Sequence, residues 1–430
     1  MSAVPAAPVW SGEAGSEPAG VLRALANALA SLACILPFCL SGNLLFMMGI
    51  PYGIESGPAF TKIHPGTWLA FLAVGLHGLR AGNPVNYIAV MGWRFPGSAV
   101  FLVLLAAVMA YNGLLPGANL SVYIDTFAVP ALMLWLLSDL REFEKRRLRL
   151  FLHVFMAVNA ALGLYEMKSG FRFTPFLIGD SEAIEWDWRS TALLGHPLSN
   201  AVTVAMYILA LALERSQPLW LRFTLIAFQL VAMSAFGARA ATGMVLLALG
   251  LLIALHILRI FAGARVSLAG AAATFAGLPL VAGAAVIVFQ SGLFDKFIDR
   301  LSDDAGSSKV RVLMFGLFKG MSWDAFLFGS NMQYIRTQQY LNGFELGIES
   351  FWLASIIQQG LVISLVLWSG MFLFFSDLVR ETGPRAIWLV CLAIAVASTS
   401  TSLAGKGPML TFLVCFVVLL LQDPKKMRKA

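Results

Sequence analysis

Three arginines lie far apart in the chain, each in a short segment beside apolar runs, where a guanidinium could contact a ligand. Arg189 begins a stretch that ends in His196-Pro197, and Arg239 lies in a turn of small residues between two apolar runs. Arg311 opens a third segment, two residues after Lys309. A guanidinium is a rigid fork of donors that matches phosphate oxygens and stays charged when partly desolvated. If the three segments converge, their arginines would form a site for a phosphate-bearing anion. In the alternative interpretation, each arginine reaches lipid headgroups or pairs with a nearby acid.

Three further residues could act beside such an anion. Glu349 directly precedes an apolar run, where a carboxylate can serve as general base for a hydroxyl, stay solvated at the membrane surface or pair with an arginine. His196 precedes a proline at an expected helix start, where a structural hydrogen bond is a commoner role than catalysis. Glu166 ends an apolar run and could orient an arginine or cap the helix. We therefore expect His196 and Glu166 to support the site.

These residues must be positioned by membrane-spanning helices, because the chain is too apolar for a soluble protein. Of its 430 residues, 59% are hydrophobic and only 12% are charged, whereas soluble domains are about 25% charged. The expected class is an all-α polytopic membrane protein with about twelve spans. The apolar runs that predict the spans are 23–48, 65–80, 95–113, 120–139, 149–166, 197–213, 219–236, 240–258, 266–290, 351–376, 385–402 and 407–422.

The distribution of basic residues predicts the sidedness of these spans. Counted from a cytoplasmic N-terminus, the densest basic runs, 141–149 and 425–429, both fall in the cytoplasm, as membrane proteins prefer. Arg189, Arg239 and Arg311 then lie on the opposite side, where arginine is scarce. The interior of the spans is nearly free of charge, so the candidate site is expected at the outer face.

The expected organisation is one membrane bundle with a single large outer loop. That loop separates the ninth span from the tenth and is partly helical, with an amphipathic pattern over Val310–Trp323. The predicted parts are a disordered cytoplasmic N-terminus (1–20), spans one to nine (21–290), the outer loop (291–350), spans ten to twelve (351–422) and a basic cytoplasmic tail (423–430).

Several kinds of chemistry lack their motifs in this sequence. There is no glycine-rich phosphate loop, no HExxH or CxxC element and no carboxylate metal box. ATP hydrolysis and zinc chemistry are therefore disfavoured, and nothing predicts a bound metal, a cofactor or a nucleic-acid partner.

In the order of these features the chain resembles the O-antigen ligase and Wzy-type polymerase superfamily, from about the third span to the end. The resemblance rests on about twelve spans with the large outer loop after the ninth, and on three arginine elements. These elements are Arg189 with Gly195-His196-Pro197-Leu198-Ser199-Asn200-Ala201, the turn Gly237-Ala238-Arg239-Ala240-Ala241-Thr242, and Arg311 before an amphipathic segment that ends in Phe328-Gly329.

The resemblance implies a GT-C-like fold in the bacterial inner membrane, with its active site facing the periplasm. It also implies an undecaprenyl-pyrophosphate-linked glycan donor, whose pyrophosphate is held by Arg189, Arg239, Arg311 and Lys309. Transfer would invert the anomeric carbon without metal or cofactor, with Arg239, Arg311 and Glu349 as catalytic groups. Membrane lipid, a chain-length regulator and a flippase of the same pathway are the implied partners.

One departure from the family pattern bears on which reaction the chain performs. Ligases of this family carry a His-Asn pair just before the span that follows the large loop, and here that place reads Ile348-Glu349-Ser350. A polymerase of exopolysaccharide or O-antigen repeat units therefore fits better than a ligase that transfers glycan to a lipid A-core or another acceptor.

A different class of function is a flippase or exporter of lipid-linked glycans. Such a transporter predicts repeat-like halves and charged or broken helices near the membrane midplane. The nearly uncharged span interiors and the basic outer face favour an enzyme instead, and no feature supports a purely structural role.

Overall fold

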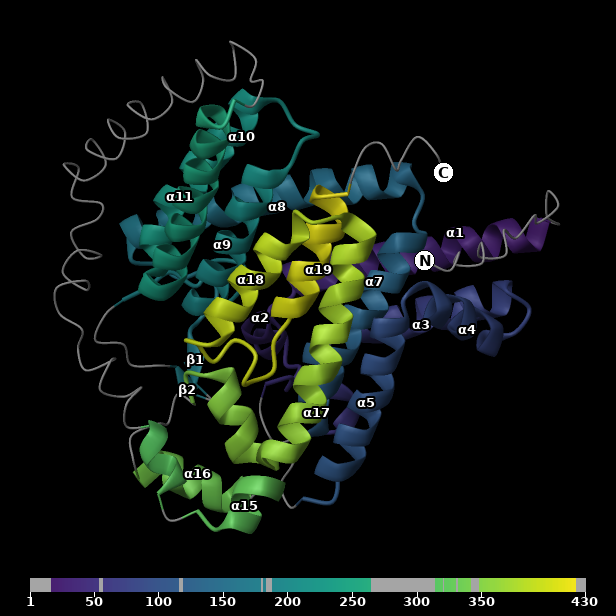
Figure 1. The fold of residues 1–430 in the computed structure, drawn as a ribbon, viewed down its shortest axis with the longest axis vertical. Helices are drawn as coiled ribbons and strands as arrows, with labels where there is room; N and C mark the ends of the chain where they lie inside the picture. Colours follow the sequence, from purple (N-terminus) through teal and green to yellow (C-terminus); the bar gives the residue numbers. More distant parts are fainter. Residues whose placement is uncertain are drawn as a thin grey trace.

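The chain folds as a helical membrane protein, seen in a computed structural model (Figure 1). The structure describes residues 17–53, 57–115, 119–178, 181–182, 188–263, 314–319, 321–329, 332–341 and 348–422. Within these residues six helical segments are long and apolar enough to cross a membrane, or seven if the bent pair Pro84–Arg94 and Pro96–Asn112 counts as one span. Three shorter apolar helices accompany them.

The elements follow the predicted apolar runs closely. Each run except 266–290, which lies outside the described residues, contains helix over most of its length, although α18 ends at Ala397, five residues before the end of the run 385–402. The elements are α1 (Glu17–Cys39), α2 (Gly42–Met47), η1 (Ala59–Lys62), α3 (Pro65–Arg80), α4 (Pro84–Arg94), α5 (Pro96–Asn112), α6 (Leu120–Val122), η2 (Tyr123–Ala128), α7 (Val129–Asp139), α8 (Glu142–Ser169), β1 (Leu177–Ile178), β2 (Ser181–Glu182), α9 (Pro197–Leu213), α10 (Leu219–Phe236), α11 (Arg239–Phe261), η3 (Met314–Phe318), α15 (Trp323–Phe328), α16 (Met332–Leu341), α17 (Phe351–Thr382), α18 (Ala386–Ala397) and α19 (Met409–Leu420).

Two expected elements differ in detail from the structure. The first apolar run, 23–48, is divided, because Ser41 caps a new helix by accepting a hydrogen bond from the backbone N–H of Leu44. The predicted Val310–Trp323 helix is not continuous: its described residues form the short 3₁₀ turn η3, and Trp323 begins the next helix, α15, after the N-cap Ser322.

The bundle is built around α19. Every residue of this helix is buried, as expected for a helix that is apolar on all sides. It packs against α7 and α9, while α17 runs along α5 and α1 pairs with α3 (Figure 1). Helices α10 and α11 pack against α9, and α8 packs against α10, α1 and α19.

One end of the bundle gathers the basic residues that were expected to share a side. Arg80 at the end of α3 lies 3.8 Å from Asp139 of α7, and Arg94 lies 2.9 Å from Glu381 of α17. Arg385 donates to a backbone carbonyl at the end of α9. These helix ends therefore meet on one side, which we call the basic end.

Near the opposite end, two spans depart from regular α-helix. Residues Tyr123–Ala128 form a π-helical turn, and such turns often occur at functional sites. Helix α17 is broken at Gly360, whose φ of 84° lies in the left-handed region. A Cβ at Gly360 would lie 2.4 Å from the backbone nitrogen of Gly329, so this approach requires glycine.

Candidate functional site

A cavity of about 650 Å³ opens at the end of the bundle opposite the basic end. Its walls come from the segments that precede α3, α9, α17 and α19 and from the two irregular turns of η2 and α17. Polar side chains line part of the cavity, among apolar ones. Among those that the structure describes are the amides of Asn43, Asn112, Asn119, Gln339, Gln358 and Gln359.

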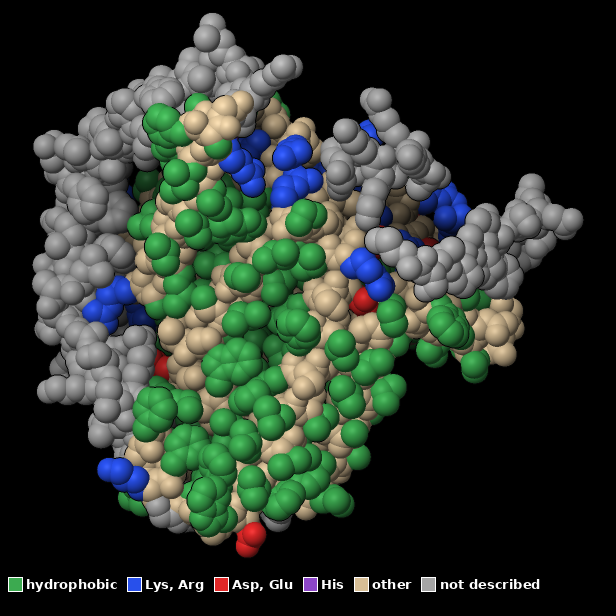
Figure 2. Space-filling view, viewed as in Figure 1, with side chains coloured by type: hydrophobic (Ala, Val, Ile, Leu, Met, Phe, Trp, Pro, Cys, Tyr) green, Lys and Arg blue, Asp and Glu red, His purple; other side chains and the backbone are tan. Residues whose placement is uncertain are grey.

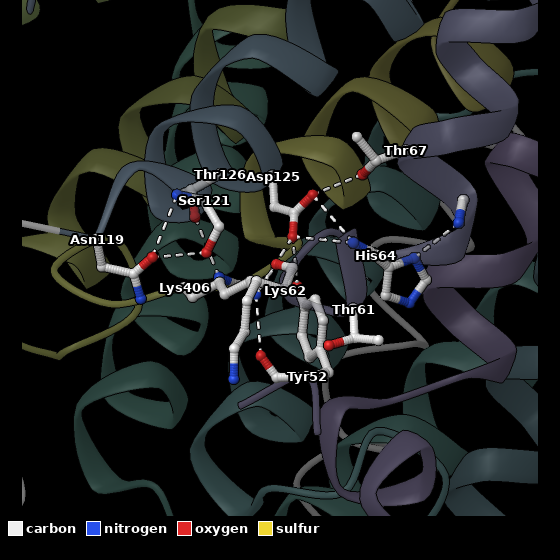
Figure 3. A network of polar contacts seen from close by, with 12 residues as sticks. Tyr52, Thr61, Lys62, His64, Thr67, Asn119, Ser121, Asp125, Thr126 and Lys406 are labelled. Carbon is white, nitrogen blue, oxygen red and sulfur yellow. Dashed lines mark hydrogen bonds and ion pairs between the residues drawn. The ribbon is translucent and has the colours of Figure 1, made fainter. Parts of the chain in front are cut away.

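A buried carboxylate, Asp125 of the π-helical turn, organises one wall of the cavity (Figure 3). Its oxygens accept hydrogen bonds from the Tyr52 hydroxyl (2.9 Å), the Thr67 hydroxyl (2.7 Å) and the backbone N–H of His64 (3.2 Å). The Lys406 ammonium lies 3.7 Å away. A buried charge is tolerated when it is paired and hydrogen-bonded in this way.

Lys406 ties together three segments at this wall (Figure 3). Its ammonium donates to the backbone carbonyls of Tyr52 (3.0 Å) and Lys62, and lies 3.6 Å from the centre of the Tyr52 ring. Desolvation lowers the pKa of Lys406 to about 8, and the nearby Asp125 carboxylate opposes that shift. The connection between α18 and α19 is thus fixed to the loop before α3.

Glu166 shapes the segment that contains Arg189. This carboxylate, at the end of α8, is fully buried and accepts three backbone N–H groups: those of Phe173 (2.7 Å), Thr191 (2.9 Å) and Ala192 (2.9 Å). Ala192 has a φ of 40°, a left-handed conformation that is unfavourable for alanine. Glu166 therefore orients the backbone of the segment that contains Arg189.

The same segment brings Arg189 towards Arg239. The backbone N–H of Ser190 donates to the carbonyl of Ala235 near the end of α10 (3.0 Å). Four residues later, Arg239 begins α11 after the left-handed Gly237. Both arginine side chains are half-buried. The structure thus brings the Arg189 segment against the end of α10, just before Arg239.

His196 connects this segment to the cavity. It is the N-cap of α9, and its Nδ1 accepts from the backbone N–H of Leu198 (3.2 Å) while its ring lines the cavity. Desolvation, and then the charge of Arg189, lower the pKa of His196 to about 4. A neutral ring with Nδ1 as acceptor carries its proton on Nε2, so His196 can donate a hydrogen bond to a ligand.

Of the three remaining predicted site residues, the structure describes Glu349 alone. Glu349 is half-buried just before α17, between Ile348 and Phe351, which both line the cavity. Arg311 and Lys309 lie outside the described residues.

Sequence reasoning missed Asp125 and Lys406, and the expectation of uncharged span interiors has an exception at Asp125. Each is a lone charge within or beside an apolar run, which marks a functional candidate in a membrane protein. That signal was present in the sequence.

No protein-family model matches the chain, and no curated protein matches its sequence. The function must therefore be argued from the cavity and from the arginine segments.

Proposed function

We propose that the protein is a membrane glycosyltransferase that polymerises undecaprenyl-pyrophosphate-linked repeat units into exopolysaccharide or O-antigen. The observation that carries this proposal is a cavity whose lining includes amides, hydroxyls and His196, beside the point where the backbone next to Arg189 is hydrogen-bonded to the segment that precedes Arg239. Amides and hydroxyls both donate and accept hydrogen bonds, as sugar hydroxyls do. Guanidinium groups match the oxygens of a pyrophosphate.

In the proposed reaction an acceptor hydroxyl attacks the anomeric carbon of the donor in a single inverting displacement. The bond from that carbon to the pyrophosphate oxygen breaks, and the charge left on this oxygen is neutralised by Arg189 and Arg239. Glu349 takes the proton of the acceptor hydroxyl. His196 would donate its Nε2 proton to a sugar oxygen in the cavity and hold the donor in place.

This proposal includes a topology of twelve spans in the bacterial inner membrane, with both termini in the cytoplasm and the 291–350 loop in the periplasm. It is supported by the basic end, which gathers Arg80, Arg94 and Arg385 on one side, as the positive-inside rule requires of cytoplasmic loops. The cavity then faces the periplasm.

Purified protein incubated with lipid-linked repeat units tests the proposal directly. A ladder of products, each longer by one repeat, is the expected result. A single transfer to a different acceptor would instead establish a ligase, and unchanged glycans moved across a vesicle membrane would establish a flippase.

The flippase remains the second candidate because two observations favour it. The break of α17 at Gly360 and the charge of Asp125 within a span are features that transporters use near their binding sites. Both lie near the cavity end, however, which agrees better with a site open to one side.

Replacing Glu349 by glutamine is expected to reduce the transfer rate by about 10² to 10⁴, since general base catalysis contributes about that much. Steady-state turnover with a lipid-linked donor measures the effect. Unchanged turnover would remove Glu349 from the role of base.

The activity is also expected to fall as the pH rises through about 8, because Lys406 is charged below its pKa of about 8 and neutral above it. Loss of the ammonium weakens its contacts with Asp125 and with the carbonyls of Tyr52 and Lys62. In a Lys406→Arg variant, which stays charged, the alkaline fall in activity should move to higher pH. In Lys406→Met, which has no charge to lose, this pH dependence should disappear. If activity falls at the same pH in the native protein and in both variants, another group titrates.

A further inference from the structure

The break in α17 marks one boundary of the membrane. Twenty residues separate Gly360 from Arg380, and the Arg380 guanidinium donates to the carbonyl of Arg94 at the basic end. At a rise of about 1.5 Å per residue this length is about 30 Å, the thickness of the hydrocarbon core. Gly360 therefore lies at the membrane boundary on the cavity side.

Helix α15 is fixed at the same depth. A Cβ added to Gly329, just after α15, would lie 2.8 Å from the carbonyl carbon of Gln359, so the two backbones are in direct contact. The Tyr111 hydroxyl, at the end of α5, donates to the carbonyl of Phe328. Helix α15 is thus attached to the outer ends of two neighbouring spans, α5 and α17.

Large aromatic side chains remain exposed on this attached segment. Trp323 is 77% exposed and Phe315 is 61% exposed, and Phe328 is also exposed. The segment nevertheless has a small apolar core, in which Met314 packs with Ile335 and Ile357. The exposed aromatics are therefore not the residues that hold the segment together.

Exposed aromatics at this depth have a physical explanation in the membrane. A large apolar side chain that stays in water loses the stabilisation that burial would give it. Aromatic residues are enriched at the level of the lipid headgroups. Figure 2 shows hydrophobic side chains that continue along the molecule to the end where α15 lies.

We propose that η3 and α15 form an interfacial anchor, with Phe315, Trp323 and Phe328 inserted at the headgroup boundary of the leaflet on the cavity side. The partner of this anchor is the lipid surface, and the anchor does not depend on which reaction the protein catalyses. The anchor would hold Gln359, which lines the cavity, at the level of the membrane surface. A lipid-linked ligand could then reach the cavity without leaving its leaflet.

Depth-dependent fluorescence quenching of the full-length protein in phospholipid vesicles tests the anchor. A single cysteine is placed at Trp323 or, as a matched control, at the exposed Asp324, after replacing Cys34, Cys39, Cys391 and Cys415. A fluorophore at 323 should be quenched by lipids brominated near the headgroup and shielded from iodide, whereas one at 324 should be quenched more by iodide. Equal, strong iodide quenching at both positions would overturn the anchor.

A second measurement covers the case in which the cysteine-free protein does not fold. In the otherwise native chain, Trp323→Phe should remove part of the tryptophan fluorescence that brominated lipids quench. Loss of only the fluorescence that iodide quenches would place Trp323 in water and overturn the proposal.

Discussion

Replacing Arg189 or Arg239 by alanine is expected to reduce the transfer rate by about 10² to 10³, the effect of removing one preorganised charge-stabilising donor. The reason is that the charge on the leaving pyrophosphate builds up as its bond to the sugar breaks. The two arginine segments are linked by the hydrogen bond from Ser190 to Ala235, so both guanidinium groups are expected to act on the same phosphates. The double variant should therefore lose much less than the product of the single effects. Turnover of each variant with a lipid-linked donor measures this.

Two kinds of variant serve as controls for these arginines. Lysine at either position keeps the charge but loses the two-pronged hydrogen bonding, so it should restore only part of the rate. Arg146→Ala removes a cation from the basic end, where Arg146 is 73% exposed and pairs with Glu142, and should leave turnover unchanged. If Arg189→Ala and Arg239→Ala both retain full polymer yield, the two residues do not bind the pyrophosphate.

The spans were predictable because the hydrophobic effect acts on local runs of sequence. The residues at which the helices begin and end were harder to predict. Helix α8 begins at Glu142, seven residues before the apolar run at 149–166, because its first turns are charged and Glu144 caps it by accepting from the backbone N–H of Arg141. A hydropathy pattern shows where a helix crosses the lipid. It does not show how far the helix continues outside the lipid.

The candidate site was predictable only where its residues follow one another in the chain. The last residues of the Arg189 to His196 stretch, Leu194 to His196, line the cavity together because neighbouring residues share a loop. The pair Asp125 and Lys406 is separated by most of the chain, and each charge by itself has several possible partners. Likewise, nothing in the sequence distinguishes Gly360 from other glycines in apolar runs, because the contact that requires glycine there is made by the distant Gly329. Such pairings arise from tertiary packing, which one sequence does not reveal.

Replacing Glu166 by glutamine is expected to lower the transfer rate nearly as much as the loss of Arg189, although Glu166 touches no ligand. One carboxylate oxygen accepts from Phe173, and the other accepts from both Thr191 and Ala192. Glutamine has a single carbonyl oxygen, and its amide group would face N–H donors. A buried donor left without an acceptor costs about 1–3 kcal/mol, so the thermal unfolding midpoint should also fall. Both turnover and the unfolding midpoint are measured, with the exposed-pair variant Glu142→Gln as the matched control.

A second substitution separates positioning by Glu166 from a general loss of stability. Glu166 holds Ala192 in a left-handed conformation, which costs an L-residue about 1–2 kcal/mol. Glycine adopts this conformation without that cost. Adding Ala192→Gly to Glu166→Gln should therefore restore part of the turnover, because the segment then needs less support to keep Arg189 in place. Recovery of the unfolding midpoint without any recovery of turnover would mean that Glu166 stabilises the fold but does not position Arg189.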